Sequence, residues 1–247
     1  MVRADNAIAI ALEASRRLKE DELKDIRESL QALGEPPIQC WWKVGKNGQF
    51  RRLDEGADEL YLNVPGDLKF RFKPGQFIQV NGEINTKMVD QMLRLVSPSS
   101  SGVAVDLFCG AGNLSLPLAK QFDQVIGVEG LNSLVAGAAQ NAIENEITTA
   151  QFFTADLTQK NSLNKIKEIP KSLDLVVLDP PRSGAIDIMH WVAKSGAKQV
   201  IYISCHPSTM VRDAKHLLDA GYKMKDLGVL DMFPHTAHVE AIALFEK

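Results

Sequence analysis

The sequence predicts an α/β fold, in which a mostly parallel seven-stranded sheet is covered by helices and preceded by a small N-terminal α+β region. After residue 102, short apolar runs rich in Val, Ile and Phe alternate with segments of helix length. This alternation is typical of a parallel sheet with helices on both faces. The last two apolar runs are separated only by a loop, which indicates an antiparallel hairpin at the edge of the sheet.

The first part of the chain has a less regular pattern. Leucines and an isoleucine spaced three and four residues apart predict a helix that ends before Gly34. The run SPSSSG (97–102) is rich in loop-forming residues and predicts a boundary. We expect strands over 7–12, 38–44, 60–64 and 68–73, and helices over 20–33 and 85–96.

The second part contains the regular alternation itself. We expect strands over 103–108, 124–128, 150–155, 173–178, 199–204, 227–230 and 239–245, and helices over 114–121, 133–143, 185–195 and 209–218.

The composition excludes several classes of protein. A chain of 247 residues with 45% hydrophobic content can bury one large core. We expect no signal peptide and no membrane segment, because Arg3 and Asp5 interrupt the first stretch and no apolar run approaches about 20 residues. Three cysteines are too few for a disulfide scaffold, so we expect a cytoplasmic protein. Net charge of −3 disfavours a protein that coats nucleic acid.

Polar residues follow the predicted strands at a single end. Since ligands bind at the carboxyl ends of parallel strands, carboxylates and thiols gathered there predict a site. His235 and His238 lack a third ligand nearby, so we expect no metal site. The residues at the strand ends are Asp106, Cys109, Glu129, Asp156, Asp179 and Cys205.

The glycine turn after the first of these strands predicts the ligand. Gly110 and Gly112 allow close approach of the backbone, but Ser115 stands where a nicotinamide-binding loop has its third glycine. Asp106 would repel a phosphate and would suit a sulfonium or amino group, while Glu129 is placed to hold ribose hydroxyls. We therefore expect S-adenosylmethionine, and a nicotinamide dehydrogenase is disfavoured.

Two further residues carry the expected chemistry. Cys205 precedes the start of a predicted helix, and a helix N-terminus lowers the pKa of a thiol and favours the reactive thiolate. Glu240 begins an apolar strand, so partial burial would raise its pKa as a general base requires. Cys109 and Cys40 are interpreted as packing residues.

Five long motifs make the sequence resemble the RNA 5-methyluridine methyltransferases. They are DLFCGAGNLSLPLA, IGVEG, VVLDPPRSGA, YISCHPSTMVRD and DMFPHTAHVEA, and the segment FIQVN (77–81) resembles the strand that leads into the catalytic domain of that family. FIQVN and DMFPHTAH favour the bacterial 23S rRNA branch, which ordinarily carries an iron–sulfur cluster, over the tRNA branch. The resemblance is continuous from residue 68 to residue 247 and loose over residues 7–64.

The resemblance implies a Rossmann-like S-adenosylmethionine-dependent methyltransferase that methylates C5 of a uridine in RNA, with rRNA favoured over tRNA. It implies that Cys205 adds to C6 of a flipped-out uracil and that Glu240 removes the C5 proton. The residues that it implies around S-adenosylmethionine are Gln79, Phe108, Asn113, Glu129, Asp156 and Asp179.

The chain also departs from the family pattern. The N-terminal RNA-binding barrel and four cluster cysteines of the family are missing from these residues, so we expect a catalytic fragment or a trimmed member that acts as a monomer. We expect a remnant of the RNA-facing central domain over 1–67 and the methyltransferase domain over 68–247. A tRNA uracil-C5 methyltransferase and a non-catalytic RNA-binding remnant remain open. Pro181 and Arg182 disfavour cytosine-C5 and amino-group methyltransferases, which would have a cysteine and an aromatic residue there.

Overall fold

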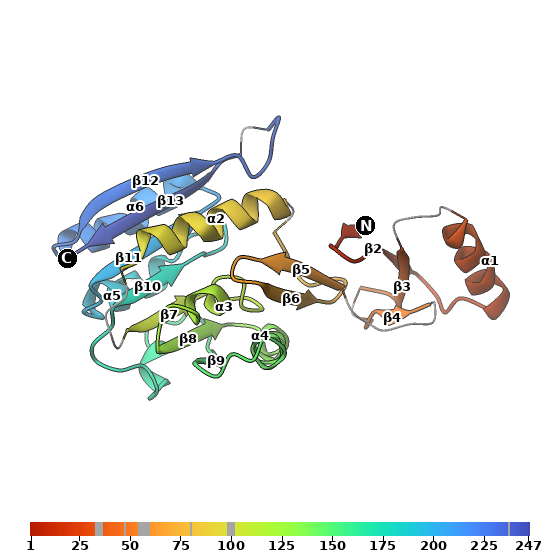
Figure 1. Cartoon of the computed structure of the whole chain (residues 1–247), viewed down its shortest axis with the longest axis horizontal. Helices are drawn as coiled ribbons and strands as arrows, with labels where there is room; N and C mark the ends of the chain where they lie inside the picture. Colours follow the sequence, from red (N-terminus) through yellow and green to blue (C-terminus); the bar gives the residue numbers. More distant parts are fainter. Residues whose placement is uncertain (33–36, 47, 54–59, 80, 98–101, 237) are drawn as a thin grey trace. The chain divides into compact units, whose positions relative to one another are not determined.

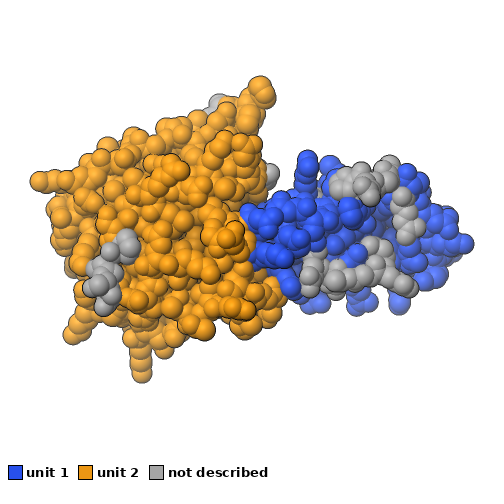
Figure 2. Space-filling view, viewed as in Figure 1, with its two compact units in different colours: residues 1–63, 69–78 blue, residues 64–68, 79–247 orange. Residues whose placement is uncertain are grey.

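The computed structural model describes residues 1–247 except 33–36, 47, 54–59, 80, 98–101 and 237. The chain divides into two compact units, which Figure 2 draws in different colours: residues 1–63 with 69–78, and residues 64–68 with 79–247. Along the chain, the division between the units therefore alternates over residues 64–78, whereas the sequence predicts one boundary between Asp67 and Leu68. The assignment of each part to a functional domain stays a prediction.

The first unit contains a four-stranded sheet in the order β1-β2-β3-β4. Strands β2 and β3 are parallel and in register from Ile8 opposite Ile38, and helix α1 connects them. Cys40 and Trp41 of β3 are buried, which confirms the packing interpretation of Cys40. The elements are β1 (Val2–Arg3), β2 (Ile8–Ala14), α1 (Glu20–Gln31), β3 (Ile38–Val44) and β4 (Arg51–Arg52).

A two-stranded sheet follows in the chain, formed by β5 (Leu60–Val64) and β6 (Leu68–Phe72). The turn between them contains Gly66 at φ +90° and Asp67 at φ +56°. Left-handed conformations of this kind are favoured by glycine and tolerated by aspartate, so the local sequence suits a tight turn.

The second unit is built on a seven-stranded sheet in the order β12-β13-β11-β10-β7-β8-β9 (Figure 1). The five strands from β11 to β9 are parallel, and β13 runs antiparallel to both of its neighbours. The predicted C-terminal hairpin is confirmed, and within it β12 is the edge strand. The strands are β7 (Val103–Leu107), β8 (Gln124–Glu129), β9 (Ala150–Thr154), β10 (Leu175–Leu178), β11 (Gln199–Ser204), β12 (Lys223–Leu230) and β13 (Glu240–Glu246).

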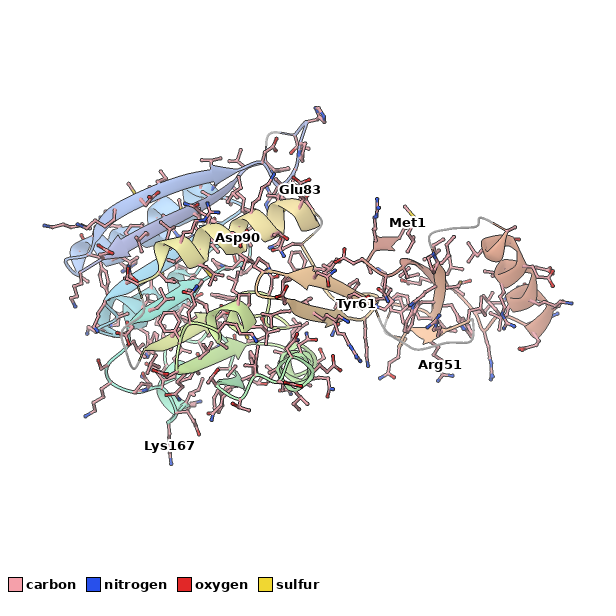
Figure 3. All side chains as sticks on the ribbon, viewed as in Figure 1. Met1, Arg51, Tyr61, Glu83, Asp90 and Lys167 are labelled. Atoms are coloured by element: carbon pink, nitrogen blue, oxygen red, sulfur yellow. The ribbon has the colours of Figure 1, made fainter. Side chains whose placement is uncertain are left out.

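Helices cover this sheet. Figure 1 shows α2 running along the sheet near β13, and Glu83 and Asp90, labelled in Figure 3, lie on this helix. None of the helices among the described residues combines the length and apolar character needed to cross a membrane. The helices are α2 (Gly82–Leu95), α3 (Ser115–Leu118), α4 (Asn132–Glu144), α5 (Ile186–Lys194) and α6 (Pro207–Asp219), with a 3₁₀ turn at Leu163–Lys165.

Side chains of the sheet alternate between two sets of neighbours. Val105 and Leu107, like every second residue of the other central strands, pack in one cluster with residues of α5 and α6. Because successive strand residues point to opposite faces, the intervening residues face the side of α2 and α3. This alternation decides which polar side chains share a face at the ends of the strands.

The structure changes the length of several predicted elements: the strand expected over 173–178 is shortened to β10, the strand expected over 227–230 is extended to β12, and one helix is shortened most clearly. The helix expected over 114–121 is reduced to α3, Ser115–Leu118. Gly112 adopts φ +98° immediately before it, and the amides of Asp123 and Gln124 already donate to the carbonyl of Gly102, where the next strand begins. Most of the boundary predicted at 97–102 lies outside the described residues.

Candidate active site

The carboxyl ends of the parallel strands bring together the residues predicted from the sequence. Asp179 and Cys205 directly follow β10 and β11, and Glu129 is the last residue of β8. Glu240 joins them because β13 is antiparallel and begins at this edge. By the alternation of the strands, Asp106, Glu129, Asp179, Cys205 and Glu240 all lie on the side of the sheet that α2 and α3 cover.

Strand register places Cys205 beside Glu240. Ser204 is opposite Ala241 in the antiparallel pair of β11 and β13, so the next residues along are Cys205 and Glu240. Glu240 is buried, at 3% exposed, and Cys205 is half-buried. A thiol and a carboxyl therefore meet at one place although 35 positions separate them in the chain.

The electrostatic setting of Cys205 differs from the expectation. Burial, Glu240 and Asp179 raise the pKa of the Cys205 thiol, and only Arg182 opposes them among neighbouring charges. The predicted lowering of this pKa by the helix N-terminus is wrong. The adjacent helix is a local feature of the sequence, whereas the carboxylates of Glu240 and Asp179 come from other strands.

Two carboxyls of the site keep their protons up to a higher pH than usual. Burial, together with the charge of Asp179, raises the pKa of Glu240 to about 7. Burial alone raises the pKa of Asp179 to about 6. Glu240 therefore exchanges a proton close to neutral pH, as a general base must.

Asp106 lies beneath the glycine turn. Its side chain is 0% exposed, and Oδ2 accepts a hydrogen bond of 2.5 Å from the hydroxyl of Ser115. Oδ1 has no hydrogen-bond partner among the described residues. Burial is the main reason that the pKa of Asp106 is raised to about 7. The charges of Asp179 and Glu129 add to the rise, and the hydrogen bond from Ser115 opposes it. The expectation of an open negative charge in front of the turn is therefore wrong.

The turn itself is shaped by three left-handed residues. Phe108, Gly110 and Gly112 have φ of +65°, +56° and +98°. A Cβ on Gly112 would lie 3.2 Å from Cγ of Leu116, so a side chain there would press on α3 as well as strain the backbone. The only non-glycine residue of the three, Phe108, packs partly against the main core.

Glu129 is fixed by the backbone around it. Its Oε1 accepts from the amides of Gly130 (2.7 Å) and Leu131 (3.1 Å), and its Oε2 accepts from the amide of Gly110 (3.2 Å). A carboxylate oxygen can accept two hydrogen bonds, which leaves one acceptor position on Oε2. Together with the turn at Gly110, this position suits a ribose hydroxyl, so these residues fit S-adenosylmethionine.

The other predicted cofactor residues lie in three separate local settings. Nε2 of Gln79 is 3.5 Å from Oδ2 of Asp179, which links them at the limit of a hydrogen bond. Asn113 exchanges two side-chain hydrogen bonds of 2.9 Å with Asn85. Asp156 is exposed after β9 and accepts from the amide and hydroxyl of Thr158, which lower its pKa.

Asn85 was not predicted from the sequence. It is 3% exposed on α2 and holds Asn113 through the reciprocal amide pair. Asn85, Met88, Val89 and Met92 form the buried stripe of the helix, and a polar residue on such a stripe is the signal that could have identified it. Cys109 is buried, at 4% exposed, as the packing interpretation predicted.

A lysine-lined cavity lies elsewhere in the second unit. A space of about 740 Å³ opens at the amino ends of β10 and β11, between Leu173, Trp191 and Ser195. Lys160, Lys171 and Lys194 line it, and no carboxylate does. Lys167, labelled in Figure 3, is exposed in the same connection before β10. Within the described residues, no three His, Cys, Asp or Glu side chains are grouped as a metal site requires.

Comparison with known proteins gives consistent matches. Residues 10–247 match the family model described as tRNA (Uracil-5-)-methyltransferase. The chain is 46% identical over 244 residues to the 23S rRNA (uracil(1939)-C(5))-methyltransferase RlmD of Pseudomonas fluorescens, covering 98% of this chain and 52% of that protein. The RlmD of Vibrio parahaemolyticus is 40% identical over 247 residues, with 100% and 54% covered. The chain spans about half the length of these curated relatives.

Solved structures match the fold. The tRNA (uracil-54, C5)-methyltransferase of Pyrococcus abyssi in complex with S-adenosyl-L-homocysteine has a TM-score of 0.71 and 26% identity, over 84% of this chain and 50% of that one. M. jannaschii TYW2 in complex with AdoMet has a TM-score of 0.58 and 16% identity, over 85% and 93%. The seven-stranded sheet is thus the Rossmann-like methyltransferase sheet predicted from the sequence.

Proposed function

The chain belongs to the tRNA (uracil-5-)-methyltransferase family, and on this premise we propose that it methylates C5 of a uridine in RNA with S-adenosylmethionine as the methyl donor. The observation that carries the proposal is the placement of Cys205 beside Glu240 by the register of β11 and β13. A binding module would need neither a half-buried thiol nor a buried carboxyl at one edge of the sheet.

In the proposed mechanism Cys205 activates the base. Its thiolate adds to C6 of the uracil, and the electron pair of the C5–C6 double bond moves toward C5 and the C4 carbonyl. Uracil C5 is otherwise a poor nucleophile, so the covalent bond divides one difficult step into two easier ones. C5 then attacks the electrophilic methyl group that bound S-adenosylmethionine would supply, and the electron pair of the broken sulfur–methyl bond would stay on sulfur, leaving S-adenosylhomocysteine.

Glu240 completes the reaction. Its carboxylate accepts the proton of C5, the electron pair of the C5–H bond restores the C5–C6 double bond, and the Cys205 sulfur leaves as thiolate. A pKa of about 7 suits this task, because the carboxylate is available at neutral pH and still basic enough to accept the proton. Gln79, Phe108, Asn113, Glu129, Asp156 and Asp179 are proposed to surround the methyl donor.

The proposed substrate is an RNA, with rRNA favoured over tRNA. The 46% and 40% identities to RlmD proteins, against 26% to the tRNA enzyme, support this preference. The uracil must leave its stack to reach Cys205, because C5 and C6 are covered in a stacked strand. A cytoplasmic monomer is part of the same proposal.

Methyl transfer from labelled S-adenosylmethionine to unmodified 23S rRNA and to unmodified tRNA tests the proposed function. We expect 5-methyluridine in rRNA, with at least about tenfold less in tRNA, a difference of about 1.4 kcal/mol. Methylation of tRNA alone would reverse the substrate preference. Binding of the methyl donor without methylation of either RNA, by a folded chain, would favour the non-catalytic remnant.

A second experiment tests the nucleophile. In RNA that contains 5-fluorouridine, fluorine replaces the proton that Glu240 would remove, so the covalent bond to Cys205 should persist. Mass spectrometry is expected to find the adduct on the peptide that contains Cys205. An equal yield of adduct from Cys205→Ala would show that another residue is the nucleophile.

A further inference from the structure

A buried aspartate joins the loop after β10 to helix α6. Asp213 is 0% exposed, and its Oδ2 accepts hydrogen bonds from the amide of Ala185 (2.6 Å) and from the hydroxyl of Tyr202 (2.7 Å). Its Oδ1 accepts from Nε of Arg212 (2.8 Å). One carboxylate therefore connects α6, strand β11 and the end of the loop.

Arg212 makes a second connection to the same loop. Its Nη2 donates to the carbonyl of Ser183 at 2.9 Å, so the loop is held on both sides of Gly184. Gly184 adopts φ +80°, and a Cβ there would lie 2.5 Å from Oδ2 of Asp213 and 2.6 Å from Nη2 of Arg212. The loop is thus pressed against this pair too closely for any side chain at Gly184.

The connection lies just behind the candidate active site. Tyr202 precedes Cys205 by three residues on the same strand and turn, and the Ser183–Ala185 segment closes the loop that begins with Asp179. Tyr202 belongs to the opposite face of the sheet from Cys205, so it holds the backbone and leaves the thiol free.

We propose that Asp213 is a positioning residue that, through Tyr202 and Arg212, holds the loop carrying Asp179 and Arg182 at a fixed place relative to Cys205. Hydrogen bonds to a charged, buried acceptor are among the stronger ones in proteins, and three converge here. Backbone placement by such bonds limits how far the side chains of the loop can move from the thiol.

The two charges on this loop make its position chemically important. Burial, Glu240 and Asp179 raise the pKa of Cys205, and Arg182 lowers it by less than Asp179 raises it. If the loop moved outward, the thiol would lose both charges of the loop and part of its burial, so its pKa would fall and more thiolate would be present at a given pH. The rate at which Cys205 reacts with an alkylating reagent therefore reports the position of the loop.

Alkylation of the native chain by iodoacetamide provides the test, with modification of the Cys205 peptide followed by mass spectrometry between pH 7 and 10. The other two cysteines, Cys40 and Cys109, are 2% and 4% exposed, so Cys205 is the accessible thiol. We expect Tyr202→Phe to speed the alkylation of Cys205 at pH 8 by about three- to tenfold, which corresponds to a fall of half to one pKa unit.

The chain offers a matched control in Tyr222. It is also buried, and its hydroxyl donates to the carbonyl of Ala197 at 2.7 Å, at the opposite edge of the sheet. Tyr222→Phe removes the same group and should leave the alkylation of Cys205 unchanged. Equal rates for the parent and both tyrosine variants would overturn the proposal, as would equal acceleration in both variants.

A double-mutant cycle separates positioning from general loosening. Arg182→Gln should slow alkylation in the parent and have a smaller effect in the Tyr202→Phe background, because the cation has already moved. The proposal would be overturned if the effects of Arg182→Gln and Tyr202→Phe on the alkylation rate multiplied, as independent effects do. If Tyr202→Phe does not fold, Arg212→Gln takes its place in the cycle, since the Arg212 side chain is 45% exposed.

The proposal rests on the proposed function only for the importance of Cys205 as the reacting thiol. Alkylation needs neither RNA nor a methyl donor, so the two can fail separately. Absence of methylation together with the predicted acceleration of alkylation would reject the proposed function and retain the positioning role of Asp213. The methylation assay adds a second readout, since a displaced loop should lower kcat more than it changes KM for RNA.

Discussion

The two ends of the parallel strands in the seven-stranded sheet differ in whether their charged side chains are exposed or buried. At the amino ends of β10 and β11, a cavity of about 740 Å³ is lined by three lysines, all of them exposed. At the carboxyl ends, Asp106 and Glu240 are buried and Asp179 is half-buried, and the pKa values of these three carboxyls are raised to about 7, 7 and 6. Burying a charge is costly, so carboxyls with raised pKa values gathered in one place indicate a functional site, whereas exposed lysines cost little. Cavity size alone therefore does not identify the reactive site in this protein.

The largest effect is expected at the thiol. Cys205→Ser should reduce methyl transfer by about four orders of magnitude, or about 5.5 kcal/mol in the barrier, because a serine hydroxyl hardly ionises near neutral pH. Single-turnover kinetics with saturating RNA measures this loss. Cys40→Ala, which removes a buried thiol from the first unit, should lose less than about tenfold. A comparable loss in both variants would contradict the assigned role.

The next effect is expected at the buried carboxyl. Glu240→Gln should slow the formation of free 5-methyluridine RNA by about 10²- to 10⁴-fold, the usual contribution of a general base. In the parent, the rate should rise with pH through about 7 as Glu240 loses its proton, and this inflection should vanish in the variant. Rates measured from pH 5.5 to 8.5 test both points.

Glu246→Gln is the matched control for this variant. Glu246 lies at the other end of β13 and accepts from Nε2 of Gln199 at 2.9 Å, so the variant removes a charge from the opposite edge. It should keep both the rate and the inflection near pH 7. Loss of the inflection in Glu246→Gln would mean that the pH dependence does not belong to Glu240.

Asp106 gives a smaller effect, which is on stability. Its pKa is about 7 in the folded chain against about 3.9 when unfolded. The folded state therefore holds a proton that the unfolded state lacks between these values. This contribution is fully present below about pH 3.9 and is lost as pH rises through about 7, with a slope of up to about 1.4 kcal/mol per pH unit.

Asp106→Asn removes this dependence. The difference in free energy of unfolding between variant and parent should move in favour of the variant from pH 4.5 to pH 7.5. Urea unfolding at several pH values measures it. A difference that stays constant with pH would mean that Asp106 is already charged in the folded chain.

The smallest effect is expected at the opposite edge. Lys171→Gln and Lys194→Gln, alone or together, should change methyl transfer by less than about twofold, because exposed charges at the amino ends of the strands are screened from the thiol. The same single-turnover assay measures this. A loss of tenfold or more would show that the lysine-lined cavity takes part in the reaction, and the two ends of the strands would then not differ as described.

Much of the fold follows from the sequence for a clear reason. The parallel strands are short apolar runs, and their ends mark the edge where polar side chains gather. The opposition of Cys205 and Glu240 depends on strand register, which the apolar pattern of β13 does not specify. Burial, and then the charges of Glu240 and Asp179, raise the pKa of Cys205, and none of these causes can be read from the adjacent helix alone.

Two residues that were missed share one signal. Asn85 lies among Met88, Val89 and Met92 on α2, and Asp213 lies with Met210, Ala214 and Leu217 on α6. Each is a polar residue at the spacing of a buried helix stripe. A buried polar side chain needs a partner, and in both helices the partner is a loop of the candidate site. The sequence carries this signal, whereas the identity of the partner requires the fold.

The most direct test of the central claim uses ordinary uridine in the RNA and the Glu240→Gln variant. If Cys205 and Glu240 act on one pyrimidine, the variant should add its thiol to C6 and methylate C5, then stall because the C5 proton has no acceptor. Denaturing gels and mass spectrometry should find a covalent, methylated RNA adduct on Cys205 that the parent does not accumulate. Release of 5-methyluridine RNA by the variant at the parent's rate, with no adduct, would contradict the account.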